Sequence, residues 1–186
     1  MEIEIKLRVK NFKKLKKQLT KLGAIFKEEM SNEDRYFTLK HRDFMKTKEC
    51  LRIRTIPEKK ISILTYKPRT TPKMKKEGFI WKKETEIQVN NEKVLSEILK
   101  RLGCIELTTV YKTRKEFELD GFVLALDDVK GIGHFLEIEK ISNDVITTKK
   151  RIWGLLEKLG FDKSDIEPAN YRDLVIKAEN RFKGGK

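Results

Sequence analysis

The sequence predicts an α+β fold, with about eight antiparallel strands closed into a β-barrel or tunnel and flanked by three or four helices. One observation is a set of segments in which charged and aliphatic residues alternate with the period of two that is typical of strands. Another is a set of amphipathic segments that have helical periodicity and end at glycine. The length of 186 residues fits a single domain spanning residues 1–186.

The first strand sets the pattern for the rest of the chain. Glu2, Glu4, Lys6 and Arg8 alternate with aliphatic residues, so the four charged side chains share one face of the strand. The aliphatic face is expected to pack on a core. Taken alone, this segment fits an ordinary half-buried strand with a solvated face, but later strands repeat the arrangement.

Seven further strands are predicted, at residues 24–39, 50–54, 61–67, 81–89, 111–119, 122–129 and 134–141. Asp120-Gly121 between two of them is a strong hairpin signal. Several of these strands also place like charges on one face. The pairs are Arg52/Arg54, Glu84/Glu86, Lys112/Arg114 and Glu137/Glu139.

Helices are expected at residues 12–22, 91–102, 145–159 and from Pro168 onward. Asn11 and Asn90 or Asn91 are candidate N-caps of the first two. The order strand, helix, Leu-Gly, strand occurs twice, which indicates either a diverged internal duplication or a chance similarity of two amphipathic units.

The composition indicates an anionic partner. Lys and Arg number 43 against 29 Asp and Glu, a formal net charge of +14. The loop at residues 68–78 is also basic and could close over an anion or simply be solvated. Two cysteines without metal-ligand spacing, no signal peptide and no apolar run of roughly 18 residues predict a cytoplasmic protein with no membrane contact.

The charged strand faces need a physical explanation, because an isolated buried charge is too costly to keep unless it is paired or bound to a metal. If the sheet curls with its aliphatic face toward the helices, the acids and bases line the interior. Opposing rows of carboxylates and cations suit a metal polyphosphate, since Arg and Lys bind phosphate oxygens and carboxylates bind hard cations. The pattern therefore predicts a tunnel for an anion and a metal.

Beyond these patterns, the chain resembles the CYTH family of triphosphate tunnel metalloenzymes over about its whole length, and is most similar to the class IV adenylyl cyclase branch. The resemblance implies an eight-stranded antiparallel tunnel with flanking helices. The residues that carry it are Glu2-x-Glu4-x-Lys6, Asp34-Arg-Tyr36-Phe37, Arg42-Asp43-Phe44, Thr47-x-Glu49-Cys-Leu51-Arg52-Ile53-Arg54, Tyr66-Lys67, Lys112-x-Arg114, Leu126-Asp127-Asp128-Val129 and Gly133-His-Phe135-Leu-Glu137-Ile-Glu139.

The resemblance also implies roles for individual residues. The metal-binding acids, for Mg²⁺ or Mn²⁺, are Glu2, Glu4, Glu137 and Glu139, assisted by Asp127. The bases that bind the triphosphate are Lys6, Arg52, Arg54, Lys67, Lys112 and Arg114. In the thiamine triphosphatase branch a tyrosine and a lysine assist catalysis, and these match Tyr36 and Lys67, although Tyr36 could equally be a packed core residue.

Several functions are compatible with these residues. The branch resemblance implies an adenylyl cyclase that converts ATP to cyclic AMP and pyrophosphate. A triphosphatase acting on inorganic triphosphate, thiamine triphosphate or a nucleotide would use the same tunnel. A non-catalytic binder of polyphosphate or RNA is a third reading, but the chain has no recognised nucleic-acid module and its acidic pairs would repel phosphate without a metal. The resemblance is compatible with a homodimer.

Overall fold

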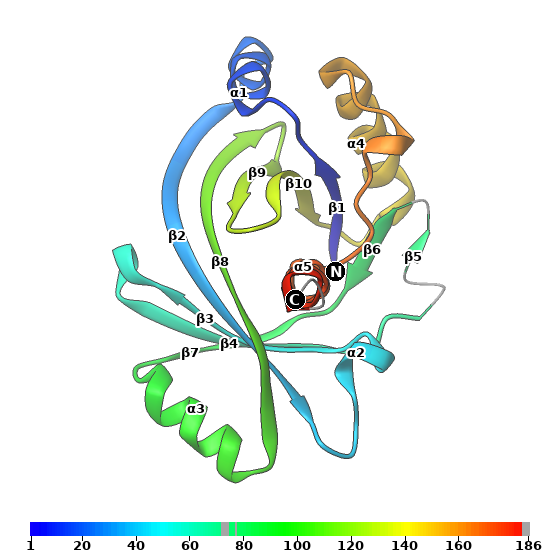
Figure 1. Cartoon of the computed structure of the whole chain (residues 1–186). Coiled ribbons are helices and arrows are strands. Elements are labelled where there is room, and N and C mark those ends of the chain that lie inside the picture. The colour runs from blue at the N-terminus through cyan, green and yellow to red at the C-terminus, as the bar shows by residue number, and fades with distance from the viewer. Residues whose placement is uncertain (72–74, 77, 184–186) are drawn as a thin grey trace.

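Ten antiparallel strands form one strongly curled sheet in the computed structural model, which describes residues 1–71, 75–76 and 78–183 (Figure 1). Along the sheet the order is β5-β6-β1-β10-β9-β8-β2-β3-β4-β7. The strands are β1 (Glu2–Arg8), β2 (Ile25–Leu39), β3 (Cys50–Ile56), β4 (Ile61–Lys67), β5 (Lys75–Lys76), β6 (Phe79–Lys82), β7 (Thr85–Val89), β8 (Cys104–Leu119), β9 (Phe122–Val129) and β10 (Gly133–Ile141).

Five α-helices accompany this sheet in the described part of the chain. They are α1 (Phe12–Lys21), α2 (Phe44–Thr47), α3 (Glu92–Arg101), α4 (Val145–Leu159) and α5 (Tyr171–Lys183). The α+β class and the curled antiparallel sheet with flanking helices are therefore confirmed. The last helix begins at Tyr171, three residues later than predicted. None of the helices described is long and apolar enough to cross a membrane.

The predicted count of eight strands is wrong because the segment 81–89 is not one strand. It breaks at Lys83 and Glu84: β6 pairs with β1, whereas β7 pairs with β4 at the far end of the sheet. The chain itself thus joins the two ends of the curled sheet, where the prediction had a closed ring of paired strands. The short β5 adds the remaining strand; it lies in the predicted basic loop 68–78, of which residues 72–74 and 77 fall outside the described residues.

The aliphatic face of the sheet builds the main core. Ile3, Ile5 and Leu7 of β1 are at most 1% exposed, and they pack with α4 through Ile152 and Leu156. Because side chains alternate along a strand, burying these residues against the helices turns Glu2, Glu4 and Lys6 to the concave side. The hydrophobic pattern therefore fixes which charges enter the interior.

The two helices of the repeated unit differ in their packing. Both begin at an asparagine whose side chain accepts backbone N–H groups, Asn11 for α1 and Asn91 for α3. Leu19 of α1 is fully buried in the main core. By contrast, Ile98 of α3 is 47% exposed. The repeated order of elements is present, but the two helices cover their strands to different extents; a duplication remains a hypothesis.

This difference predicts that truncating an apolar side chain lowers the free energy of unfolding more on α1 than on α3. Leu19→Ala should destabilise the protein by about 3 kcal/mol, because it opens a cavity in the main core. Ile98→Ala on α3 should cost less than about 1 kcal/mol, because that side chain is half solvated. Urea unfolding of both variants measures the difference, and equal losses would contradict this account of the packing.

Candidate functional site

A cavity of about 600 Å³ occupies the concave side of the sheet. Nine basic and six acidic residues line it, a formal excess of three positive charges. The bases are Lys6, Arg52, Arg54, Lys67, Lys82, Lys83, Lys112, Arg114 and Arg172, and the acids are Glu2, Glu4, Glu84, Glu86, Glu137 and Glu139. All six predicted triphosphate-binding bases and four of the five predicted metal-binding acids thus face one cavity.

Strand register brings acids that are distant in the sequence together. In the pairing of β1 with β10, Glu4 lies opposite Glu139 and Lys6 lies opposite Glu137. Directly opposed residues of antiparallel strands present their side chains on the same face, with Cβ atoms about 5 Å apart. Two strands that are far apart in the sequence, β1 and β10, therefore contribute to one cluster of carboxylates.

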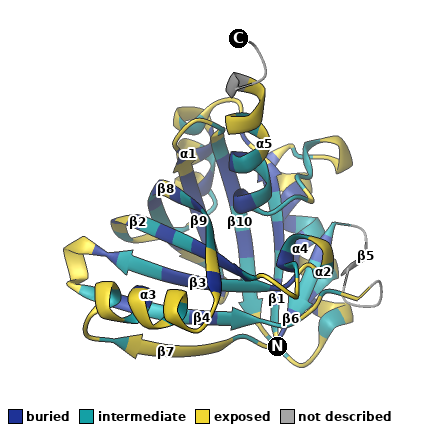
Figure 2. Cartoon of the chain, turned by 60° about the horizontal axis from the view of Figure 1, so that its bottom comes forward, coloured by how far each residue is buried: buried dark blue, intermediate teal, exposed yellow. Residues whose placement is uncertain are grey.

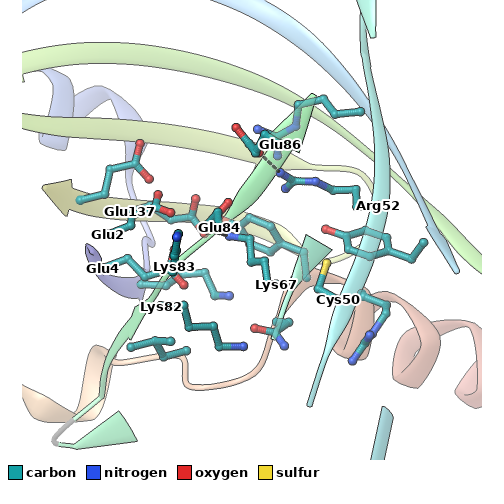
Figure 3. A pocket seen from close by; sticks show the side chains of 18 of the residues that line it. Glu2, Glu4, Cys50, Arg52, Lys67, Lys82, Lys83, Glu84, Glu86 and Glu137 are labelled. Carbon is teal, nitrogen blue, oxygen red and sulfur yellow. Dashed lines mark ion pairs between the residues drawn. The ribbon is translucent and has the colours of Figure 1, made fainter. Parts of the chain in front are cut away.

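Three of these acids form a candidate metal centre, called here the acid triad. Carboxylate oxygens of Glu2, Glu4 and Glu139 all lie within 4.8 Å of one another. Oxygen donors at this spacing fit a hard divalent cation such as Mg²⁺ or Mn²⁺. Figure 3 shows the side chains of Glu2 and Glu4 grouped with that of Glu84 on one side of the cavity, near Lys67.

Electrostatics distinguish two neighbouring carboxylates at this centre. Burial, together with the hydrogen bond between Glu2 and Glu84, raises the pKa of Glu2 to about 10. Burial acts in the same direction on Glu84, but the hydrogen bond from Glu2 and the charge of Lys67 lower the pKa of Glu84 to about 2. Without a bound cation, Glu2 therefore holds a proton at neutral pH and Glu84 does not.

The other two predicted metal-binding acids contact bases. Buried Asp127 accepts hydrogen bonds from Lys112 at 2.8 Å, from Arg114 at 2.8 and 2.7 Å, and from the Tyr171 hydroxyl at 3.0 Å. Although burial opposes ionisation, Arg114 and Lys112 hold the pKa of Asp127 well below its usual value. Glu137 forms an ion pair with Arg114. In this structure both acids position bases; their predicted role at a metal stays a prediction.

A second buried acid positions the bases of β3. Arg54 donates to Asp34 through Nε at 2.7 Å and Nη2 at 2.8 Å, and Arg52 lies 3.7 Å from the same carboxylate. Asp34 is fully buried, and despite that burial the two guanidinium groups lower its pKa far below the ordinary value. Asp34 belongs to the Asp34-Arg-Tyr36-Phe37 motif, but the sequence did not indicate its anchoring role.

The two residues predicted to be catalytic line the same cavity, Tyr36 from β2 and Lys67 from β4, with β3 between these strands. Lys67 pairs with Glu84, and although burial disfavours its charge, Glu4 and Glu84 hold the pKa of Lys67 above the usual value. Tyr36 is buried, and burial together with the charge of Asp34 raises the pKa of its hydroxyl. Both groups therefore keep their protons at neutral pH, which suits hydrogen-bond donation better than proton abstraction.

The structure adds lining residues that the sequence analysis left unassigned. Lys82 and Lys83 enter because the 79–89 segment crosses between the ends of the sheet, a path that alternation alone does not reveal; Glu84 and Glu86, one of the predicted charged pairs, line the cavity with them. Tyr171 and Arg172 enter because α5 covers one end of the curled sheet, opposite the N-terminus (Figure 2).

Helix α5 is anchored to the site by its first two residues. The Tyr171 ring lies 4.3 Å from Lys6 Nζ and 5.0 Å from Lys112 Nζ, distances at which the ring face attracts an ammonium group. Arg172 is 1% exposed and donates to the Glu49 carbonyl at 2.9 Å. The covered end of the cavity therefore carries cationic groups and is closed by buried side chains of α5.

Comparison with known proteins agrees with this arrangement. The family model described as CYTH domain matches residues 1–171. A protein of Methanocaldococcus jannaschii named as a "putative adenylate cyclase" is 32% identical over 177 residues, which cover 94% of this chain and 98% of that protein. The solved structure of the PH1012 protein from Pyrococcus horikoshii is 34% identical, with a TM-score of 0.83, covering 94% of this chain and 99% of that one.

A more distant structure shares the fold alone. It is a "putative adenylyl cyclase" from Hippeastrum, 19% identical with a TM-score of 0.67, covering all of this chain and 97% of that one. That protein is described as having a dominant triphosphatase activity.

The raised pKa of Glu2 predicts how the metal-free protein responds to Glu2→Gln. The folded chain keeps a proton on Glu2 up to about pH 10, whereas the unfolded chain releases it near the ordinary value of 4.5, so stability is lost as pH rises between these values. Glutamine at this position is uncharged at every pH, so its burial carries no such pH-dependent loss of stability. The variant should therefore raise Tm at pH 8 in EDTA by at least about 2–4 °C, the shift that 1 kcal/mol produces in a chain of this size.

The comparison between pH values provides the control for this prediction. At pH 4, where Glu2 is protonated in both states, Tm of the variant and of the unaltered protein should nearly coincide. A variant that is less stable than the unaltered protein at pH 8 would contradict the assignment of the proton to Glu2.

Proposed function

The chain belongs to the CYTH family, and from this premise we propose that it is a divalent-metal-dependent adenylyl cyclase that converts ATP to cyclic AMP and pyrophosphate. The observation that carries the proposal is the acid triad facing rows of anchored bases within one cavity. The family implies a divalent metal and triphosphate substrates. The name of the Methanocaldococcus jannaschii relative favours the cyclase reaction.

The anchored bases supply most of what this chemistry requires. In a reaction at phosphorus the protein mainly positions the chain of phosphates and stabilises charge on the oxygens. Arg114 and Lys112 are held by Asp127, and Arg52 and Arg54 by Asp34, so their donors are oriented before substrate arrives. Such preorganised cations bind the phosphates and stabilise the leaving pyrophosphate.

The acid triad is the proposed site of the metal, with Mg²⁺ or Mn²⁺ as the ion. A divalent ion bound by Glu2, Glu4 and Glu139 would neutralise phosphate charge and favour ionisation of a hydroxyl that it contacts. The 3′-hydroxyl oxygen of ATP then forms a bond to the α-phosphorus, its proton is released, and the bond to the β-phosphate breaks. Lys67 and Tyr36, which keep their protons, donate to phosphate oxygens in this scheme.

The proposal also includes a location and an assembly state. A cytoplasmic location is favoured by the two cysteines, Cys50 and Cys104, which are both free. A homodimer stays a prediction from the family resemblance.

Product analysis tests the reaction directly. Incubation with ATP, inorganic triphosphate and thiamine triphosphate, each with Mg²⁺ and with Mn²⁺, should give cyclic AMP and pyrophosphate from ATP. Orthophosphate without cyclic AMP would replace the cyclase with a triphosphatase. No turnover of any substrate, with RNA binding that persists in EDTA, would favour a non-catalytic binder.

Removing one charge from the acid triad tests the metal site. Glu4→Gln should lower turnover on the order of 100-fold or more, because a ligand of the metal is lost while the shape of the side chain is kept. Glu97→Gln is the matched control on the surface of α3, where Glu97 pairs with Arg101, does not line the cavity and should not affect turnover. Undiminished turnover in Glu4→Gln, with an intact circular dichroism spectrum, would rule out the assigned site.

A further inference from the structure

A buried carboxylate outside the cavity is left unexplained by the proposed reaction. Glu49 is 1% exposed and does not line the cavity, although the next residue, Cys50, does. Its ion-pair partner Arg42 does not line the cavity either. Burying a carboxylate is costly unless hydrogen bonds and positive charge compensate it. The contacts of Glu49 therefore indicate what its burial stabilises.

Three side chains hold the carboxylate of Glu49. Arg42 donates through Nε at 2.9 Å and has its Nη2 at 2.8 Å, the Thr47 hydroxyl donates at 2.6 Å, and the Tyr66 hydroxyl donates as well. Although burial opposes ionisation, these hydrogen bonds lower the pKa of Glu49. The hydrogen bond to Glu49 in turn raises the pKa of the Tyr66 hydroxyl. At neutral pH Glu49 is therefore a charged acceptor and Tyr66 is its donor.

Tyr66 connects this carboxylate to a residue of the cavity. It directly precedes Lys67 on β4, and because side chains alternate along a strand, the Tyr66 ring points away from the cavity that Lys67 lines. The pairing of β3 with β4 sets Leu51 opposite Tyr66 and ends at Cys50 opposite Lys67, two residues that Figure 3 labels beside each other. Lys67 is thus the last residue of its strand and belongs to the last pair of this ladder.

The contacts of Glu49 secure this end of the ladder. The end of a strand is the part that opens most readily. Here the hydrogen bond from Tyr66 ties β4 to Glu49, which directly precedes β3 and whose carbonyl accepts a hydrogen bond from Arg172 of α5. The backbone of Lys67 is thereby held from behind the cavity lining, while its ammonium group pairs with Glu84 inside the cavity.

Resting on the proposed function, we propose that Glu49 is a positioning residue that acts through Tyr66 to hold Lys67 in place for the reaction. Lys67 donates to phosphate oxygens in the proposed scheme, and such a donor is most effective when its position is fixed before charge develops in the transition state. Even a small displacement of a reacting or stabilising group slows a reaction at a preorganised site. Glu49 then contributes to the rate without contacting the substrate.

A double-mutant cycle on turnover of ATP with Mg²⁺ tests this role. Tyr66→Phe removes the hydroxyl but keeps the ring, and should lower kcat on the order of tenfold while changing KM by less than about threefold. In a Lys67→Ala background the same change should lower kcat by less than about twofold, because the group that it positions is already absent. Tyr111→Phe is the matched control, since Tyr111 of β8 is 47% exposed, does not line the cavity and should change neither constant.

Glu49→Gln should show the same dependence on Lys67, because an amide accepts through only one of its two ends and loses the ion pair with Arg42; Tyr66→Phe carries the test alone if this variant does not fold. Equal effects of Tyr66→Phe with and without Lys67, or no effect, would overturn the positioning role and leave the proposed function standing. If the unaltered protein converts no triphosphate, the proposed function fails. The same cycle on Mg²⁺-dependent binding of imidotriphosphate, measured by calorimetry, then supports positioning if the effect disappears without Lys67 and overturns it otherwise.

Discussion

The organisation of the site depends on the compensation of buried charge. Asp127 and Asp34 are each fully buried, and each is matched by two bases rather than by solvent. Removing one partner of such a group leaves an uncompensated charge in a medium of low polarity, which is far more costly than the intact pair is stabilising. Well-packed apolar residues would often stabilise a barrel interior better. Retaining so many charges is thus better explained by an anionic ligand than by stability.

Because the sheet is curled, the alternation of apolar and charged residues along its strands places the charged side chains around one cavity. Burying Ile3, Ile5 and Leu7 under α4 forces Glu2, Glu4 and Lys6 inward, and antiparallel register then sets Glu139 and Glu137 opposite two of them. The hydrophobic pattern and the strand pairing are sufficient to explain which charged residues lie opposite one another. The same logic explains why the inner face carries charged side chains and the outer face carries the apolar residues that pack with α4.

The sequence was sufficient for the features that depend on periodicity. The strand faces of β1, β3, β8 and β10, the caps Asn11 and Asn91, and the fold class all follow from local patterns. The crossing of the 79–89 segment did not, because an alternating run looks the same whether it pairs with one neighbour or changes neighbours at Lys83 and Glu84. The position of α5 over one end of the cavity also depends on tertiary packing, which its helical pattern does not encode.

The sequence also did not show which carboxylates pair with bases and which form the acid triad. Glu137 and Glu139 are two residues apart on one strand face, yet Glu137 pairs with Arg114 and Glu139 joins the acid triad. The difference arises from neighbours on other strands. Burial and nearby carboxylates raise the pKa of Glu139, whereas Lys112 and Arg114 outweigh burial and lower that of Glu137. A divalent cation is therefore most favourable at the triad, where three carboxylates lie close together, and phosphate oxygens are most favourable near Lys112 and Arg114, which are already positioned by Asp127. In a triphosphate bound with a metal, the cation would lie at the acid triad and the negative phosphate oxygens would lie among these bases.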